Sequence, residues 1–155
     1  MSRPDLFNYS DPAQAPDDPQ AGLILQGLDD GAWNVLLGFV EQLAYRTGSP
    51  ILQAGESGRS IYIVRSGHVR GQIQAGRKTR QTGRMGPGAV FGELGFFDGV
   101  PRSASLWAED DVELLVMSQA GFERMAVWHP RLARGLLMDL GRVISTRLRR
   151  AEAQR

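Results

Sequence analysis

The sequence predicts a mainly β fold, a jelly-roll-like β-roll with one N-terminal helix and two C-terminal helices. Twelve of the nineteen glycines fall between Gly48 and Gly99, where they separate short runs rich in β-branched and aromatic residues. Regularly spaced short strands with turn residues between them are typical of an all-β sandwich or barrel. On both sides of this region, apolar residues return every three or four positions instead, which indicates helices.

The first twenty residues differ in composition from the rest of the chain. They hold four prolines and four aspartates, with few apolar residues to offset the entropy cost of ordering. We therefore expect residues 1–22 to form a disordered lead-in and residues 23–155 to form one domain. No apolar run is long enough to span a membrane and no secretory signal is present, so we expect a cytoplasmic protein without membrane contact. The absence of cysteine fits a reducing compartment.

Three helices are predicted from the apolar spacing. The first covers residues 28–43, with Asp29 or Asp30 as its N-cap. A short helix covers residues 120–128, and Pro130 suits the first position of a longer helix. The apolar stripe of that helix consists of Leu136, Leu137, Leu140, Ile144, Leu148 and Ala151. This stripe either packs on the β-roll or pairs with the same helix of a second copy, and we favour the homodimer.

The strands expected between these helices each end at turn residues. They are residues 50–53, 60–64, 68–73, 78–84, 103–108 and 112–117, with one more strand that runs into Gly92.

Residues 90–105 interrupt the strand pattern with chemistry suited to an anion. A helical turn that starts at Glu93 leaves backbone N–H groups without internal partners, and Gly92 allows close approach to the backbone. Arg102 presents a planar fork that matches two phosphate oxygens. Because Glu93 would be repelled by a neighbouring anion, it needs a hydroxyl donor, and a ribose 2′-OH would supply one.

Phe-Gly-Glu-Leu-Gly at 91–95, followed by Pro-Arg-Ser-Ala at 101–104, resembles the phosphate-binding cassette of the cyclic nucleotide-binding domain family. That family includes the bacterial catabolite activator proteins and the regulatory subunits of cAMP-dependent protein kinase. The resemblance extends from about residue 25 to residue 150. It implies that Glu93 accepts a hydrogen bond from the ribose 2′-OH and that Arg102 binds the cyclic phosphate. The remaining nucleotide-binding positions that it implies are Gly92, Leu94, Ser103 and Ala104 around the phosphate, and Thr82 and Gly83 facing the base.

Base recognition departs from the catabolite activator pattern. The last helix carries Ala151 and Glu152 where that branch of the family has two hydroxyl side chains that reach the base. We favour cAMP over cGMP as the ligand. The resulting hypothesis is a non-catalytic sensor that relays cyclic nucleotide binding, through movement of the C-terminal helix, to an effector protein or a dimer. The alternative is a dimerisation or scaffold module with a vestigial pocket.

Enzymatic and metal-dependent functions are disfavoured by the residues present. The two histidines, His68 and His129, cannot supply the roughly three His and one Glu of a metal site in a related β-roll, and no cofactor is expected. No nucleophile elbow of the Gly-x-Ser-x-Gly type occurs. The arginines of the C-terminal segment are interpreted as a solvated face that complements the helix dipole. Relatives that act on DNA carry a helix-turn-helix after this helix, and we expect no DNA binding by this chain itself.

Overall fold

A computed structural model describes residues 24–25, 27–75 and 77–153 of the 155-residue chain. The predicted lead-in, residues 1–22, lies outside the described residues. The elements in chain order are α1 (Asp30–Leu37), β1 (Glu41–Tyr45), β2 (Pro50–Leu52), β3 (Ile61–Ser66), β4 (Val69–Ala75), β5 (Lys78–Gln81), β6 (Val90–Phe91), α2 (Glu93–Asp98), β7 (Ala104–Ala108), β8 (Val112–Met117), α3 (Gln119–Trp128) and α4 (Pro130–Ala153).

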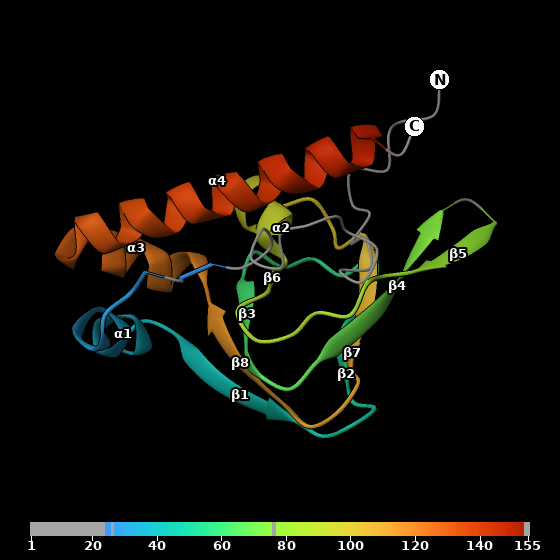
Figure 1. The fold of residues 1–155 in the computed structure, drawn as a ribbon, viewed down its shortest axis with the longest axis horizontal. Coiled ribbons are helices and arrows are strands. Elements are labelled where there is room, and N and C mark those ends of the chain that lie inside the picture. The colour runs from blue at the N-terminus through green and yellow to red at the C-terminus, as the bar shows by residue number, and fades with distance from the viewer. Residues whose placement is uncertain (1–23, 26, 76, 154–155) are drawn as a thin grey trace.

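The strands form two antiparallel four-stranded sheets. One has the order β1-β8-β3-β6 and the other has the order β2-β7-β4-β5. Between them lies one apolar cluster, which includes Val64, Phe91, Leu106 and Leu114. The predicted mainly β class with flanking helices is therefore confirmed, and the β4–β5 hairpin lies on the opposite side of the roll from α1 and α3 (Figure 1).

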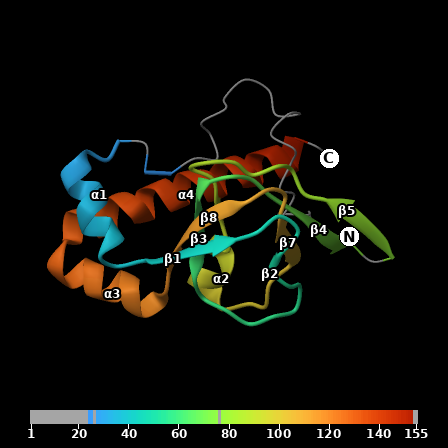
Figure 2. The same ribbon diagram turned by 90° about the horizontal axis from the view of Figure 1, so that it is seen from below.

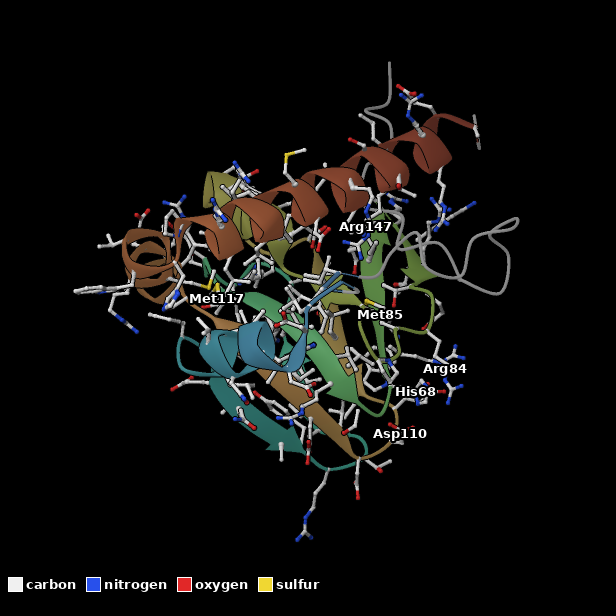
Figure 3. All side chains as sticks on the ribbon, turned by 60° about the vertical axis from the view of Figure 1, so that its left-hand side comes forward. His68, Arg84, Met85, Asp110, Met117 and Arg147 are labelled. Carbon is white, nitrogen blue, oxygen red and sulfur yellow. The ribbon has the colours of Figure 1, made fainter. Side chains whose placement is uncertain are left out.

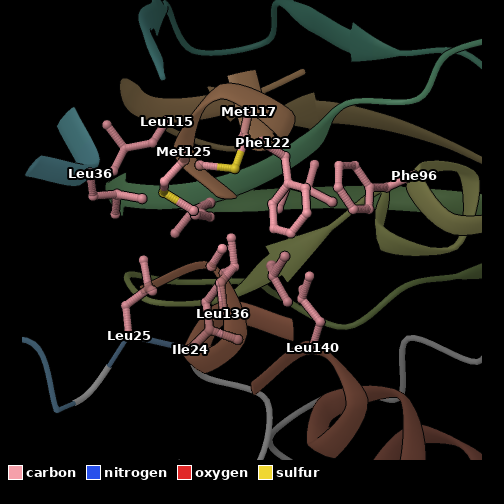
Figure 4. Packing of buried hydrophobic residues seen from close by; sticks show 14 of the residues in the cluster. Ile24, Leu25, Leu36, Phe96, Leu115, Met117, Phe122, Met125, Leu136 and Leu140 are labelled. Carbon is pink, nitrogen blue, oxygen red and sulfur yellow. The ribbon is translucent and has the colours of Figure 1, made fainter. Parts of the chain in front are cut away.

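The helices gather on the other face of the β1-β8-β3-β6 sheet, where α4 lies across the roll (Figures 1 and 2). A second apolar cluster fills this layer, with Leu115 and Met117 from β8, Phe122 and Met125 from α3, and further residues from α4 (Figure 4). Because the sheet is covered on both faces, five of the six residues of β8 are buried. Alternate residues of β8 thus serve the two clusters.

The N-terminal helix is shorter than its spacing predicts. Asp29 is its N-cap and accepts a hydrogen bond from the Ala32 N–H at 2.8 Å, as expected. The helix ends at Leu37, and residues 41–45 form β1, which pairs with β8 from Glu41↔Val116 to Tyr45↔Val112. The prediction of a helix to residue 43 is wrong, because strand pairing with a distant segment outweighs the local helical period.

The apolar stripe of α4 divides between two faces. Leu136 and Leu140 are buried against the roll, whereas Leu137 and Leu148 are each 39% exposed. The structure therefore supports packing on the β-roll for part of the stripe and leaves another part on the surface.

A cluster of ionisable groups joins the β3–β4 and β7–β8 turns at the end of the roll. The His68 Nδ1 and Asp110 Oδ2 atoms are 2.7 Å apart, and Glu109 accepts from Arg70 at 3.0 Å and from Arg84 at 2.6 Å. Figure 3 shows His68, Arg84 and Asp110 gathered at this end. None of the helices among the described residues is long and apolar enough to cross a lipid bilayer.

Candidate functional site

The segment from β6 through α2 to β7 is shaped by Gly92. This residue is the N-cap of α2 and has φ +77°, a left-handed conformation that favours glycine. A Cβ atom at this position would lie 2.8 Å from Nη1 of Arg102 and 2.9 Å from the Ser60 carbonyl oxygen. Glycine thus allows the turn and lets the Arg102 guanidinium lie directly against the backbone.

Arg102 is buried, with 8% of its surface exposed. Its Nη1 donates to the Gly92 carbonyl at 2.8 Å and its Nη2 donates to the Ser60 carbonyl at 2.9 Å. Its own backbone is held by two bonds to the β2–β3 loop, from the Arg102 N–H to the Glu56 carbonyl and from the Gly55 N–H to the Arg102 carbonyl, both 2.8 Å. The two side-chain bonds use two of the five N–H donors of the guanidinium.

Tyr62 of β3 contacts the same guanidinium. The Cζ atom of Arg102 lies 5.9 Å from the centre of the Tyr62 ring, within the range of a cation–π interaction. The ring in turn stacks on Phe91 at 5.0 Å with an interplanar angle of 5°. Burial raises the pKa of the Tyr62 hydroxyl above its usual value, against the opposing effect of Arg102. Tyr62 therefore packs against the Arg102 cation, and Phe91 packs against the Tyr62 ring.

Glu93, the first residue of α2, is a buried carboxylate with 1% of its surface exposed. Its Oε1 forms an ion pair with Nη1 of Arg147 from α4, and Nη2 of Arg147 donates to the Val90 carbonyl at 2.6 Å. The other carboxylate oxygen, Oε2, has no hydrogen-bond partner among the described residues. Figure 3 shows Arg147 on the side of α4 that faces the sheets.

The far end of α2 is fixed to two other elements. Nη2 of Arg59 donates to the carbonyls of Phe96 and Phe97 at 3.2 and 3.1 Å, and Nε2 of Gln119 from α3 also donates to the Phe96 carbonyl. The Phe96 ring packs edge-on against Phe122 of α3 at 5.5 Å. Both ends of α2 are thus connected to the C-terminal helices.

A cavity of about 100 Å³ lies beside α2. Its lining includes Leu52 and Leu106 and five residues predicted from the sequence, which are Gly92, Leu94, Arg102, Ser103 and Ala104. The structure therefore brings the two halves of the predicted cassette together around one cavity.

Three predicted residues lie outside this lining. Glu93 is adjacent in the chain but directs its carboxylate to Arg147. Thr82 and Gly83 are both buried just beyond the end of β5, where the Thr82 N–H donates to the Gly71 carbonyl and the Thr82 hydroxyl donates to the Gly83 carbonyl. The prediction that these two residues belong to the strand itself is wrong, because β5 ends at Gln81.

Arg147 is the residue that the sequence interpretation missed. It was grouped with a solvated arginine face, yet only 14% of its side chain is exposed. A signal for it exists in the sequence, because Arg147 continues the spacing of the buried residues Leu136, Leu140 and Val143. A cation on the buried face of a helix indicates a buried acidic partner.

The arrangement can hold a small anion that also carries a hydroxyl group. Arg102 retains donors for anionic oxygens, and the free Oε2 of Glu93 is an acceptor that lacks a donor. Among the described residues, no group of three or more acidic or histidine side chains is placed to hold a metal ion.

Comparison with known proteins gives a consistent result. The family model described as cyclic nucleotide-binding domain matches residues 42–127, more than half of the chain. The cyclic AMP receptor protein of Thermus thermophilus is 32% identical over 132 residues, which are 84% of this chain and 59% of that protein. This chain therefore spans about three fifths of the length of that relative.

Solved structures agree with this result. The crystal structure of the Thermus thermophilus catabolite activator protein is 31% identical with a TM-score of 0.72, covering 83% of this chain and 59% of that one. A cyclic nucleotide-binding domain from Methylobacillus flagellatus KT shares the fold with a TM-score of 0.76 at 22% identity, covering 86% of this chain and 76% of that one. With a matching family model, a matching roll and the cassette geometry in place, this chain belongs to the cyclic nucleotide-binding domain family.

Proposed function

We propose that this chain is a non-catalytic, cytoplasmic sensor of a 3′,5′-cyclic nucleotide, with cAMP preferred over cGMP. One observation carries the proposal: the buried carboxylate of Glu93 keeps one oxygen without a hydrogen-bond partner, next to the glycine whose carbonyl holds the buried Arg102 guanidinium. A cation bound to the Gly92 carbonyl and an unsatisfied acceptor on the next residue fit a ligand that joins an anion to a hydroxyl.

The cyclic phosphate is assigned to Arg102 with the backbone of Gly92, Leu94, Ser103 and Ala104. Support comes from the cavity that these residues line and from the two carbonyls that orient the guanidinium before a ligand arrives. Because the side chain is already ordered, binding loses less conformational entropy than it would with a mobile arginine. Ser103 adds an exposed hydroxyl at the cavity.

The ribose 2′-OH is assigned to Oε2 of Glu93. Leaving a buried acceptor unsatisfied costs about 1–3 kcal/mol, and a hydroxyl donor from the ligand would recover this free energy. The same hydroxyl is absent from a 2′-deoxy ligand, so the assignment predicts discrimination at that position.

The preference for cAMP is supported by the name of the Thermus relative, a cyclic AMP receptor protein. Thr82 and Gly83 are assigned to the base. Because the Thr82 hydroxyl already donates to the Gly83 carbonyl, base recognition there would be partly through the backbone.

The relay is assigned to Arg147. This residue links Oε1 of Glu93 to α4. A ligand that donates to Oε2 and places its phosphate nearby therefore favours the arrangement in which Arg147 is paired with Glu93. Ligand binding shifts the population only through such a difference in affinity between arrangements. The C-terminal part of α4 then settles against the cassette, and a second copy or an effector protein receives the signal.

We favour a homodimer, formed through α4, as the assembly that receives the signal. Leu137 and Leu148 are large apolar side chains left exposed on one flank of the helix. Such a flank is typical of a helix-pairing surface when a folded domain supports it.

The test is isothermal titration calorimetry of the purified chain with cAMP, cGMP, 2′-deoxy-cAMP and 5′-AMP. We expect binding of cAMP, weaker binding of cGMP and of the 2′-deoxy compound, and none of 5′-AMP at the same concentrations. A parallel thermal melt should show stabilisation by RT ln(1 + [L]/Kd), about 2.7 kcal/mol at one hundred times Kd. A chain that ignores every cyclic nucleotide would instead favour the scaffold module with a vestigial pocket.

A further inference from the structure

The turn between α3 and α4 carries large apolar side chains on the surface. Val127 and Trp128, the last two residues of α3, are 73% and 75% exposed, and Met138 of α4 is 71% exposed. The other two tryptophans of the chain, Trp33 and Trp107, are only partly exposed. Large apolar side chains that lie together on a surface indicate a binding site, whereas scattered ones do not.

Three arginines share the exposed helix faces with these side chains. Arg124 lies one turn before Trp128 on α3. On α4, Arg131, Arg134 and Met138 follow one another along one face at spacings of three and four. The three arginines are exposed, and none of them forms an ion pair with another side chain of the described part of the chain. We call this surface the corner patch, and it consists of Arg124, Val127, Trp128, Arg131, Arg134 and Met138.

The helix dipole does not account for the arginines of the corner patch. Arg131 is the second residue of α4, where the positive end of the dipole disfavours a cation, and no acidic residue lies in that first turn. Residues 119–138 contain three arginines and a single acidic residue, Glu123. The patch therefore has a net positive charge, which is complementary to an anionic partner.

The corner patch lies on a well-packed base. Phe122 and Met125 of α3 and Leu136 of α4 are buried in the apolar cluster beneath the two helices (Figure 4). Between the helices, the His129 N–H donates to the Met125 carbonyl at 2.7 Å, and the His129 ring packs edge-on against Phe39 at 5.8 Å. The exposed side chains of the patch can therefore be replaced without disturbing the core.

The place of the corner patch favours a flat partner over a peptide. Figures 1 and 2 show the α3–α4 turn at one end of the molecule, on the far side of the roll from the β4–β5 hairpin. An extended peptide is usually held by a groove or by a free strand edge, and a helix offers only its side chains because its backbone groups are bonded internally. A bilayer surface needs neither feature, since tryptophan rings are favourable at the headgroup level and anionic headgroups attract arginine.

We propose that the corner patch binds the surface of an anionic phospholipid bilayer. The apolar side chains enter the headgroup region, and the arginines bind lipid phosphates. The expectation of a protein without membrane contact rested on the lack of spanning and secretory segments, and surface binding of this kind requires neither. The proposal is independent of cyclic nucleotide binding, and its tests are made without nucleotide, so the two proposals fail separately.

Sedimentation of the full chain with lipid vesicles tests the proposal. One set of vesicles contains phosphatidylcholine alone, and the other also contains about one third phosphatidylglycerol, which is anionic. We expect the chain to sediment with the second set and not with the first, and to be released when added salt screens the headgroups. A chain that sediments with neither set would overturn the proposal and leave a protein partner for the patch.

Two double variants with the same change in net charge locate the binding surface. Arg131→Gln with Arg134→Gln removes two charges from the corner patch, and Arg46→Gln with Arg84→Gln removes two from exposed arginines outside it. We expect the first pair to lower the partition coefficient about 25-fold, because each cation near an anionic surface contributes about fivefold. The second pair should lower it by less than about threefold. Equal losses would show that net charge alone drives binding and would overturn the role of the patch.

Tryptophan emission reports whether Trp128 enters the bilayer. Binding to the anionic vesicles should shift the emission of the wild type to shorter wavelengths, because the indole leaves water. Trp128→Phe keeps an apolar side chain and should still sediment, but it should lose most of the shift. Trp128→Ala should bind about tenfold more weakly, with an unchanged Tm because the side chain is exposed. A wild-type emission that does not move on binding, or a full shift in Trp128→Phe, would overturn the insertion of Trp128.

Discussion

Arg147 of α4 and Glu93 of α2, 54 positions apart in the chain, form an ion pair in the interior of the protein. The pair connects the first residue of α2 directly to the last helix. The other oxygen of Glu93, Oε2, accepts no hydrogen bond from the described residues, so the carboxylate can still accept one from a ligand. A structural contact and a candidate ligand contact therefore share a single carboxylate.

Removing one member of this pair should cost more than removing both. Arg147→Met leaves the buried carboxylate of Glu93 without its cation, and we expect a loss of about 3 kcal/mol in the free energy of unfolding. Arg147→Met combined with Glu93→Gln removes the uncompensated charge and should be less damaging than Arg147→Met alone. Urea unfolding of the two single variants and the double variant measures this coupling. Strictly additive losses would show that the pair is not coupled.

Arg102→Ala should weaken cAMP binding by at least about tenfold, because charge-assisted hydrogen bonds to the phosphate are worth about 1.5–3 kcal/mol each. Glu93→Ala should weaken binding by a smaller factor. Arg84→Ala is the control, since Arg84 is an exposed arginine paired with Glu109 at the other end of the roll. Titration calorimetry measures the cAMP affinity of the three variants. An unchanged affinity in Arg102→Ala would show that Arg102 does not bind the phosphate.

Gly92→Ala should destabilise the protein more than Gly99→Ala does. Both glycines have positive φ, +77° and +68°, so both alanines carry a backbone penalty of about 1–2 kcal/mol. An added Cβ at Gly92 would also meet Arg102 and the Ser60 carbonyl closer than 3.0 Å, whereas at Gly99 the nearest atom belongs to the flexible Arg59 at 3.6 Å. Comparing the thermal unfolding of the two variants isolates the effect of the close contacts with Arg102 and the Ser60 carbonyl from the backbone penalty. Equal shifts in Tm would mean that the backbone penalty alone matters.

Acid should destabilise the turn cluster at the end of the roll. The hydrogen bond from Arg84, with that from Arg70, lowers the pKa of Glu109 below its usual 4.5, and the bond from His68 lowers the pKa of Asp110 below its usual 3.8. A carboxyl whose pKa is lower in the folded state stabilises the fold above its unfolded pKa and loses that contribution as pH falls through the folded pKa. Stability should therefore fall below pH 4.5 less steeply in Glu109→Gln and Asp110→Asn than in the wild type.

Urea unfolding at several pH values measures this effect. Glu123→Gln, which changes an exposed carboxylate of α3 outside the cluster, is the control and should keep the wild-type slope. Since both carboxylates of the cluster are near the surface, we expect a modest change. If Glu109→Gln and Asp110→Asn leave the slope of the unfolding free energy against pH unaltered, the two carboxylates do not stabilise the fold through these bonds.

Leu148→Arg should weaken self-association through α4. The substitution places a charge on the exposed apolar flank that Leu148 shares with Leu137, where a second helix would have to bury it. Met138→Arg is the control, because Met138 is 71% exposed on the outermost side of the same helix. Sedimentation equilibrium compares the variants with the wild type. Loss of association in Met138→Arg alone would move the interface to the outer face.

Most of the fold was predictable because its signals are local. Glycine-separated β-branched runs gave the strands, Asp29 marked the first helix, and Pro130 marked the start of α4. The apolar spacing predicts a helix through residue 43, and only the pairing of β1 with β8 makes residues 41–43 part of a strand. Local spacing cannot report a partner that lies so far along the chain.

The cassette was also predictable in part, because glycine, proline and arginine at fixed spacing constrain a short segment wherever it lies. Gly92 and Arg102 were inferred from their residue types, Leu94, Ser103 and Ala104 were implied by the family resemblance, and all five line the cavity. The carbonyl of Ser60, the ring of Tyr62 and the guanidinium of Arg147 belong to other elements, and no spacing within the cassette names them.

The sequence by itself predicted the fold class and the family, and it singled out Arg102 and Glu93. The tertiary structure alone decided which groups satisfy these charges, namely two backbone carbonyls for Arg102 and an arginine of the last helix for Glu93. The physical reason is that turn conformations depend on neighbouring residues, whereas the partner of a buried charge depends on which distant segment the folded chain brings against it.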